Sequence, residues 1–276
     1  MRLEFVKMHG LGNDFLLIDL PTTGTLPTSA EWRALADRRT GIGFDQALVI
    51  GPPRAAEHTA SYRIFNADGS EAQQCGNGVR CIAALLAARG HAPQRELQLE
   101  SSGGVVRARV LDDGQVAVEM GVPDFRPSAL PLLVPAEALH YTLQLADREV
   151  RFGAVSIGNP HAVLEVDDVD AAPVQTIGPA LQRHSAFPQG VNVGFMQILD
   201  AAHIRLRVFE RGAGETRACG TGACAAVAVG RRHGRLGAHV DVALPGGVLQ
   251  IDWPGPGASL WMTGPAVEAF RGSVEL

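Results

Sequence analysis

Apolar and polar residues alternate in short runs along much of the chain, and this pattern predicts strands. The runs are bounded by Gly, Pro, Asn or Asp, which is typical of strands joined by turns. In chain order the expected strands are 2–7, 15–18, 47–50, 61–65, 97–100, 105–110, 116–119, 203–209, 237–244, 247–253 and 259–262. Residues 29–38 instead have helical spacing, with Ser29 as the expected N-cap.

Two further helices are predicted by runs of small residues that are apolar nearly all round. One covers residues 76–89 and the other residues 220–230. A helix without a polar face is normally enclosed by other elements, so we expect each to lie within a shell of strands. Each run begins directly after a cysteine, Cys75 or Cys219, in a glycine-rich turn.

The second half of the chain repeats the first. CGNG from Cys75 returns as CGTG from Cys219, 144 residues later, and the Gly-Asn pair at 12–13 returns at 158–159. GFDQAL at 43–48 is matched by GVNVGF at 190–195, at an offset of 147. These matches predict a duplication with two domains, 1–120 plus 264–276 and 121–263. The last segment is expected to return to the first domain as a strand.

Composition excludes several classes of protein. The 276 residues are 46% apolar, which supports a real core, and the net charge of −5 disfavours nucleic acid or an anionic membrane as partner. No run of about 20 apolar residues and no signal-peptide pattern is present. A cytoplasmic protein is therefore the expectation.

The four cysteines are expected to be reduced thiols, because disulfides are rare in the cytoplasm. Their spacings, C-x5-C and C-x4-C, do not match structural zinc sites, so no metal is expected. Lys7 is the only lysine. A pyridoxal-phosphate enzyme needs a Schiff-base lysine, and no phosphate-binding motif surrounds Lys7, so no cofactor is expected.

A cysteine at the start of a helix can act as an acid or a base. The first N–H groups of a helix have no intrahelical partner and the helix dipole is positive there, so the pKa of a thiol is expected to fall below about 8.5. The same N–H groups can hold a carboxylate. Two such thiols could deprotonate and reprotonate opposite faces of a carbon next to a carboxylate, which inverts it. Cys81 and Cys224 lie within the apolar runs and are expected to be core residues.

NADGSEAQQCGNGVRC, at residues 66–81, closely resembles the signature of the diaminopimelate epimerase family. Six further segments along the chain are similar to segments of that family: KMHGLGNDF (7–15), GFDQ (43–46), GNPH (158–161), GVNV (190–193), ERGAGETRACGTGA (210–223) and MTGPA (262–266).

The resemblance implies an α+β fold of two pseudo-symmetric halves. Each half would be a β-barrel-like sheet wrapped around a central buried helix, with the active site in the cleft between the halves. The implied reaction is the cofactor-independent interconversion of L,L- and meso-diaminopimelate, a small-molecule substrate, for lysine and peptidoglycan synthesis. A homodimer is also implied.

The resemblance assigns roles to individual residues. Cys75 and Cys219 are the expected acid/base pair, and His161 and Glu210 are expected to modulate the pKa of the thiols. Substrate-binding residues, at the two helix N-termini or around them, are expected to be Asn13, Gln46, Asn66, Gly76, Asn77, Asn159, Asn192, Glu210, Arg211, Gly220 and Thr221. Arg80 fits the signature, and a structural salt bridge is its expected role.

Three other functions remain open at this point. A cysteine-pair isomerase of the proline racemase type would share the two-base chemistry, although a small cyclic substrate needs fewer polar contacts. A thiol–disulfide redox protein would normally carry C-x-x-C, which is missing here. A non-catalytic binding module would have no evident use for two matched thiols.

Overall fold

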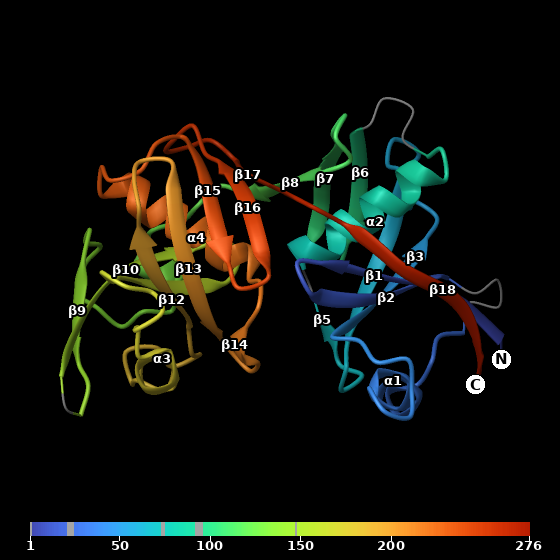
Figure 1. Cartoon of the computed structure of the whole chain (residues 1–276), viewed down its shortest axis with the longest axis horizontal. Helices are drawn as coiled ribbons and strands as arrows, with labels where there is room; N and C mark the ends of the chain where they lie inside the picture. Colours follow the sequence, from blue (N-terminus) through green and yellow to red (C-terminus); the bar gives the residue numbers. More distant parts are fainter. Residues whose placement is uncertain (1, 21–24, 73–74, 92–95, 147) are drawn as a thin grey trace. The chain divides into compact units, whose positions relative to one another are not determined.

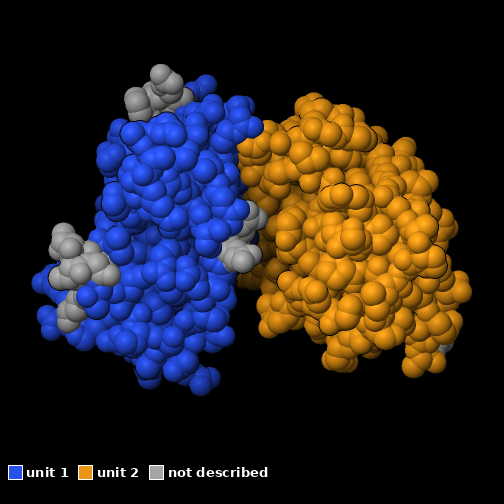
Figure 2. Space-filling model, turned by 180° about the vertical axis from the view of Figure 1, so that it is seen from behind, with its two compact units in different colours: residues 1–118, 263–276 blue, residues 119–262 orange. Residues whose placement is uncertain are grey.

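The computed structural model describes residues 2–20, 25–72, 75–91, 96–146 and 148–276. These residues form two compact units, shown in different colours in Figure 2. Unit 1 contains residues 1–118 and 263–276, and unit 2 contains residues 119–262. Among the described residues, no helix has the length and apolar character that a membrane crossing requires.

Unit 1 is a mixed sheet that carries two helices (Figure 1). The chain pairs β1 with β2, β3 with β4, β4 with β5, β6 with β7 and β7 with β8 as antiparallel neighbours, while β2–β3 and β4–β6 are parallel. Its elements are β1 (Arg2–Gly10), β2 (Asn13–Asp19), α1 (Ser29–Ala36), β3 (Gln46–Gly51), β4 (Ala60–Asn66), β5 (Glu71–Ala72), α2 (Gly76–Ala88), β6 (Glu96–Ser101), β7 (Gly104–Val110), β8 (Val116–Gly121) and β18 (Val267–Glu275).

The apolar helix α2 lies inside the curve of this sheet. It contacts β1, β2 and β3 and also β7, so strands from distant parts of the sheet close around it. The side chains of Val79, Ile82, Leu85 and Leu86 are all buried there, as the all-round apolar pattern predicted. The first turn of α2 is therefore held in place by the whole sheet.

The outer face of the sheet is covered by α1. Trp32 of α1 is buried and stacks on Phe65 of β4 with 5.2 Å between ring centroids, and it meets Phe44 edge to face. The expected N-cap, Ser29, is wrong by one residue. Thr28 is the cap, because its side chain accepts from the Glu31 N–H while the Glu31 carboxylate accepts from the Thr28 N–H, a capping box.

Unit 2 has the same order of elements. Its elements are η1 (Pro127–Ala129), β9 (Tyr141–Gln144), β10 (Glu149–Ser156), β11 (Pro160–Glu165), α3 (Val174–Gln182), β12 (Asn192–Ile198), β13 (His203–Glu210), β14 (Gly214–Thr216), α4 (Gly220–Arg232), β15 (His239–Leu244), β16 (Gly247–Asp252) and β17 (Leu260–Gly264). The helix α4 contacts β10, β11, β12, β13 and β16, so it is enclosed as α2 is, and α3 packs on β12 and β13. The pattern of apolar residues did not predict α3, β9 or β10.

The strand pairings confirm the internal duplication. β10–β11, β12–β13, β13–β14 and β15–β16 are antiparallel, while β11–β12 and β13–β15 are parallel, which repeats the pairing order of unit 1. Phe15 pairs with Gln46 in unit 1 and His161 pairs with Asn192 in unit 2, so the offset at these strands is 146. The predicted match of GVNVGF to GFDQAL was thus one residue out at the strand. Gln46 lies three positions after Gly43, whereas Asn192 lies only two positions after Gly190.

The C-terminal segment returns to unit 1 as expected. β18 pairs antiparallel with β1 over its whole length, from Arg2 opposite Glu275 to His9 opposite Val267. In unit 2 the first strand of the repeat, β10, is covered instead by the preceding hairpin strand β9. Both ends of the chain therefore lie in unit 1 (Figure 1).

The capping box gives a stability prediction. Thr28→Ala should lower the free energy of unfolding by about 1 kcal/mol, because the Glu31 N–H loses its acceptor and the Glu31 carboxylate loses the hydrogen bond from the Thr28 hydroxyl. Ser29→Ala is the matched control and should have a much smaller effect. Urea denaturation of both variants tests this, and equal losses would contradict the assignment of Thr28 as the cap.

Candidate active site

In unit 1, the turns and strand ends of the sheet bring three amide side chains to the edge at which α2 begins. Leu11 and Gly12 both have positive φ, of 56° and 85°, in a two-residue hairpin turn that places Asn13 at the start of β2. The parallel pairing of β2 and β3 sets Gln46 beside Phe15, and the antiparallel pairing of β3 and β4 sets Asn66 opposite Gln46. We call these amides, Cys75 and the first turn of α2 half-site 1.

The thiol of Cys75 lies at the N-cap of α2 and is partly exposed. Its Sγ is 3.9 Å from Oδ1 of Asn13, and the same oxygen accepts a hydrogen bond of 3.1 Å from Nδ2 of Asn77. Gln46 donates to Oδ1 of Asn66 over 2.9 Å. Half-site 1 therefore brings together the expected residues Asn13, Asn77 and Cys75, with the Gln46–Asn66 pair on the adjoining strands.

Half-site 2 is the equivalent place in unit 2. It contains Cys219 at the N-cap of α4, Thr221 in the first turn, and four side chains that the strands deliver: Asn159, His161, Asn192 and Glu210. The register aligns Asn192 with Gln46 and Glu210 with Asn66, because Val193 pairs with Phe209 as Ala47 pairs with Phe65. Asn159 donates to Oγ1 of Thr221 over 3.3 Å.

Cys219 donates a hydrogen bond to the Glu210 carboxylate, with 3.0 Å from Sγ to Oε2. The other oxygen of Glu210 accepts a short hydrogen bond from the Thr216 hydroxyl, which fixes the carboxylate. Burial, followed by the charge of Glu210 and the hydrogen bond to it, raises the pKa of Cys219 well above its ordinary value. The expectation that a helix start lowers the thiol pKa is thus wrong for Cys219. The backbone N–H of Gly222 does act in that direction, but desolvation and the carboxylate outweigh it.

The imidazole of His161 is completely buried, at the position that Phe15 occupies in unit 1. Burial, aided by the charge of Arg211, lowers the pKa of His161 to about 3, so the ring is neutral at physiological pH. Its Nε2 lies 3.0 Å from Oδ1 of Asn159. Within half-site 2, His161 therefore contacts Asn159 and supports the side-chain amide of that residue.

Backbone contacts hold the residues behind the half-site. Asn192 is buried, and its Oδ1 accepts from the backbone N–H of Arg211 over 2.9 Å while its Nδ2 donates to the Pro160 carbonyl over 3.0 Å. The guanidinium of Arg211 is exposed and donates to the Gln189 carbonyl over 2.9 Å. Its remaining donors leave Arg211 able to bind a carboxylate.

The residues that follow each cysteine give both half-sites an anion-binding N-terminus. Gly76 and Asn77 open α2, and Gly220 and Thr221 open α4. The early N–H groups of a helix have no intrahelical acceptor, so these turns can bind a carboxylate. Space is tight there: a Cβ on Gly222 would lie 2.9 Å from Val208 and 3.2 Å from Sγ of Cys219, which explains the glycine.

The other two cysteines are core residues, as the apolar runs predicted. Cys81 and Cys224 are fully buried, and burial raises the pKa of Cys81 to about 12. Arg80 is also fully buried, and its Nε donates to the Pro265 carbonyl over 3.2 Å, which ties α2 to the segment before β18.

Sequence reasoning missed two residues that hold the half-sites. Asp45 accepts a 2.8 Å hydrogen bond from Asn13, and Thr216 binds Glu210. Asp45 precedes Gln46 in the GFDQ segment, and this position beside an expected site residue could have identified it. In the described ranges no group of three or more His, Cys, Asp or Glu side chains could hold a metal ion.

His161 gives a prediction about stability and pH. The folded state keeps the imidazole neutral down to about pH 3, while the unfolded chain takes up its proton near pH 6.5. The contribution of His161 to the free energy of unfolding is therefore undiminished above pH 6.5. As the pH drops from 6.5 toward 3, this group lowers the free energy of unfolding by up to about 1.4 kcal/mol per pH unit. His161→Phe, the residue used in unit 1, should remove this part of the slope.

Urea denaturation of wild type and His161→Phe between pH 7.5 and 5 measures the effect, and His91→Phe at an exposed position is the control. If the free energy of unfolding changed with pH equally in wild type and His161→Phe, His161 would take up its proton in the folded state as it does in the unfolded chain, and the prediction would be wrong.

Known proteins resemble the chain over its whole length. The family model described as diaminopimelate epimerase matches residues 5–126 and 153–268. Proteins named diaminopimelate epimerase from Alkalilimnicola ehrlichii and Chromobacterium violaceum are 54% and 53% identical, each over 100% of both chains. Among solved structures, a hydroxyproline epimerase from Agrobacterium vitis has a TM-score of 0.70 at 18% identity, over 99% of this chain and 92% of its own. That likeness shows the fold, which is the α+β fold expected. By the family model and these full-length relatives, the chain belongs to the diaminopimelate epimerase family.

Proposed function

We propose that this chain interconverts L,L- and meso-diaminopimelate by moving a proton on and off one α-carbon. The observation that carries the proposal is the repeated half-site: in each of two units of the same topology, a cysteine caps an apolar helix enclosed by a sheet. Membership of the family indicates diaminopimelate as the substrate, and the full-length relatives are named diaminopimelate epimerase.

Both half-sites act on one substrate carbon in this proposal. A carboxylate bound by helix N-terminal N–H groups stabilises negative charge that develops at the adjacent α-carbon. One cysteine removes the α-proton as thiolate, and the other delivers a proton to the opposite face as thiol. The two sulfurs exchange roles for the reverse reaction, so no external acid or base is consumed.

Cys219 is the better candidate for the protonated partner in the resting enzyme. Its thiol is buried, donates to Glu210, and has a raised pKa. Cys75 would then start as the base. If an enzyme in this resting state is to begin the reaction in the other direction, Cys219 must first lose its proton and Cys75 must gain one. Glu210 is placed to accept the proton of Cys219, because Oε2 is already the acceptor of that hydrogen bond.

The polar lining favours a long substrate with two amino-acid ends. Amide side chains lie in the half-sites at Asn13, Gln46, Asn66 and Asn159, and the buried amide of Asn192 lies behind them. A cyclic imino acid, such as the hydroxyproline bound in the structurally similar hydroxyproline epimerase, offers fewer groups for such contacts. We assign the distal carboxylate to Arg211, whose planar guanidinium can bind it with two hydrogen bonds.

We propose further that the enzyme is a homodimer without a cofactor and works in the cytoplasm. The family resemblance supports the dimer, and the place of the reaction in lysine and peptidoglycan precursor synthesis supports the compartment. Analytical ultracentrifugation of the purified chain tests the dimer.

Single cysteine replacements test the two-base mechanism. Cys75→Ala and Cys219→Ala should each abolish conversion of L,L-diaminopimelate, because each removes the acid or base on one face of the α-carbon. The assay is incubation in D2O, with α-deuterium and stereochemistry followed by NMR and chiral chromatography.

Cys81→Ala and Cys224→Ala are the matched controls and should keep most activity, since their thiols lie in the core. Circular dichroism of all four variants confirms folding. Turnover at the wild-type rate in either Cys75→Ala or Cys219→Ala would rule out the two-base mechanism.

Arg211→Lys tests the assignment of the distal carboxylate. A point charge replaces a planar pair of donors, so kcat/KM for diaminopimelate should fall by roughly tenfold or more. The loss should be smaller for an analogue that lacks the distal carboxylate. Arg205→Lys, in β13 (His203–Glu210) shortly before Arg211 and paired with Asp170, is the control. Equal losses with both substrates would move Arg211 away from the distal end.

A further inference from the structure

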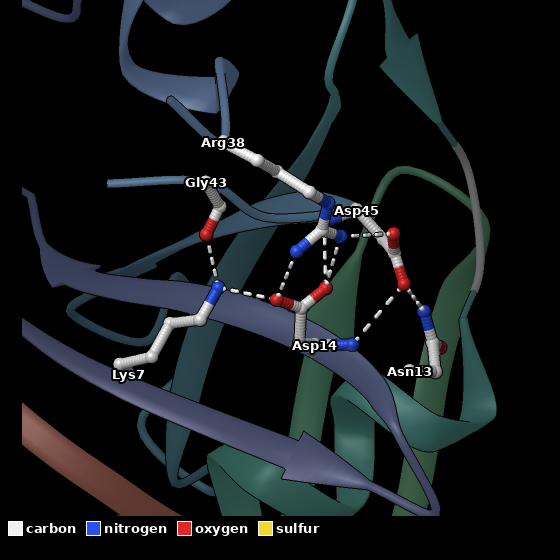
Figure 3. Close-up of polar contacts among 6 residues, drawn as sticks. All are labelled: Lys7, Asn13, Asp14, Arg38, Gly43 and Asp45. Carbon is white, nitrogen blue, oxygen red and sulfur yellow. Dashed lines mark hydrogen bonds and ion pairs between the residues drawn. The ribbon is translucent and has the colours of Figure 1, made fainter. Parts of the chain in front are cut away.

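A cluster of charged residues lies behind Asn13 in unit 1 (Figure 3). Asp14 accepts from Lys7 over 2.6 Å and from both terminal nitrogens of Arg38, at 2.9 and 2.7 Å. Arg38 also donates to Asp45 over 2.7 Å. Although burial acts against it, hydrogen bonds from Arg38 and Lys7 hold the pKa of Asp14 well below its ordinary value. Four charges thus form one connected group, and the only lysine of the chain belongs to it.

Asp45 is held in this group from several directions. Its Oδ1 accepts from Arg38, and its Oδ2 accepts from the backbone N–H of Asp14 over 3.2 Å. Its own backbone N–H donates to the Asp14 carbonyl over 3.0 Å and lies 3.1 Å from Oδ1 of Asp14. The carboxylate therefore has a fixed position relative to the start of β2.

That fixed carboxylate determines which way the Asn13 amide faces. Nδ2 of Asn13 donates to Oδ2 of Asp45 over 2.8 Å. An ionised carboxylate only accepts hydrogen bonds, so the NH2 group must face Asp45 and the oxygen must face the opposite side. On that side lie Sγ of Cys75 at 3.9 Å and Nδ2 of Asn77 at 3.1 Å. The oxygen, not the NH2 group, is presented to the thiol.

The equivalent amide in unit 2 has different neighbours. Asn159 lies between the imidazole of His161, at 3.0 Å, and the hydroxyl of Thr221, at 3.3 Å. A neutral imidazole and a hydroxyl can each donate or accept, so neither forces the Asn159 amide into one orientation. Of the two half-sites, only half-site 1 therefore has a neighbour that fixes the orientation of this amide.

We propose that Asp45 is a positioning residue for the reaction: supported by Arg38, Asp14 and Lys7, it locks the Asn13 amide so that an acceptor oxygen faces the thiol of Cys75. The catalytic role of Asp45 rests on the proposed function, but the orientation of the Asn13 amide does not depend on the substrate. An acceptor beside Cys75 hydrogen-bonds the thiol and destabilises the thiolate, which strengthens the thiolate as a base. An N–H in the same place would stabilise the thiolate and weaken it.

Asp45→Asn is the variant that tests the lock. Its side-chain amide can donate as well as accept, so the Asn13 amide is free to turn its NH2 group toward Cys75. The thiolate fraction of Cys75 should rise, and alkylation of Cys75 by iodoacetamide at pH 7, measured by mass spectrometry of its peptide, should be roughly three- to tenfold faster. At the same time kcat for diaminopimelate should fall.

Loss of the Asp45 charge alone would also favour a thiolate, so the measurement is repeated in an Asn13→Ala background. If Asp45 acts through Asn13, Asp45→Asn should accelerate alkylation much less in that background than in wild type. Asp45→Glu keeps an acceptor-only group and should restore an alkylation rate close to wild type. Asp19→Asn, which removes one acid of an exposed ion pair at the other end of β2, should change nothing.

Equal acceleration in both backgrounds, or none in either, would overturn the proposal. The alkylation rates need no substrate, so they remain informative even if the chain acts on a different compound. Conversely, a positive alkylation result together with no turnover of diaminopimelate would leave the lock standing and contradict the proposed function.

Discussion

Enclosing a helix in a curved sheet is the constraint on which both half-sites depend. A helix that is apolar all round has no face to give to water, so strands must cover it on nearly every side, as β1, β2, β3 and β7 do for α2. Its two ends are where backbone polar groups remain available, and the N-terminus is the end that offers N–H donors. A cysteine placed there meets the strand ends of the sheet, and those ends deliver Asn13 or Asn159.

Much of this arrangement could be predicted from sequence because it follows local patterns. The buried helices follow from apolar runs, the duplication from repeated glycine turns, and the returning strand β18 from its place after the completed second repeat. The helix α3 was missed because Pro173, Gly178 and Pro179 are typical of turns, although a short helix with tertiary packing tolerates them. The one-residue shift before Asn192 was missed because loop length is set by the turn and not by the strand pattern.

The protonation of the thiols could not be predicted from the motif. A helix start argues for a lowered pKa, and that argument holds for the N–H of Gly222. Whether it prevails depends on burial and on the nearest charge, and both are tertiary facts. For Cys219 the sheet removes water and β13 supplies Glu210, so the thiol keeps its proton. The same limit applies to Asp45, whose effect on Asn13 depends on a contact across 32 residues.

A duplicated fold begins with two equal thiols, so a difference between them must come from substitutions at equivalent positions. Strand register aligns Glu210, an acid, with Asn66, an amide, and aligns the neutral ring of His161 with Phe15. On the helices, the buried cation Arg80 of unit 1 is replaced by Cys224, at the same offset of 144 as the two N-cap cysteines. The acid that contacts a thiol directly, Glu210, therefore belongs to half-site 2, and the buried cation lies on the helix of Cys75. The contact with Glu210 favours a proton on Cys219. In the two-base mechanism that we propose, this substitution marks Cys219 as the partner that starts as the thiol.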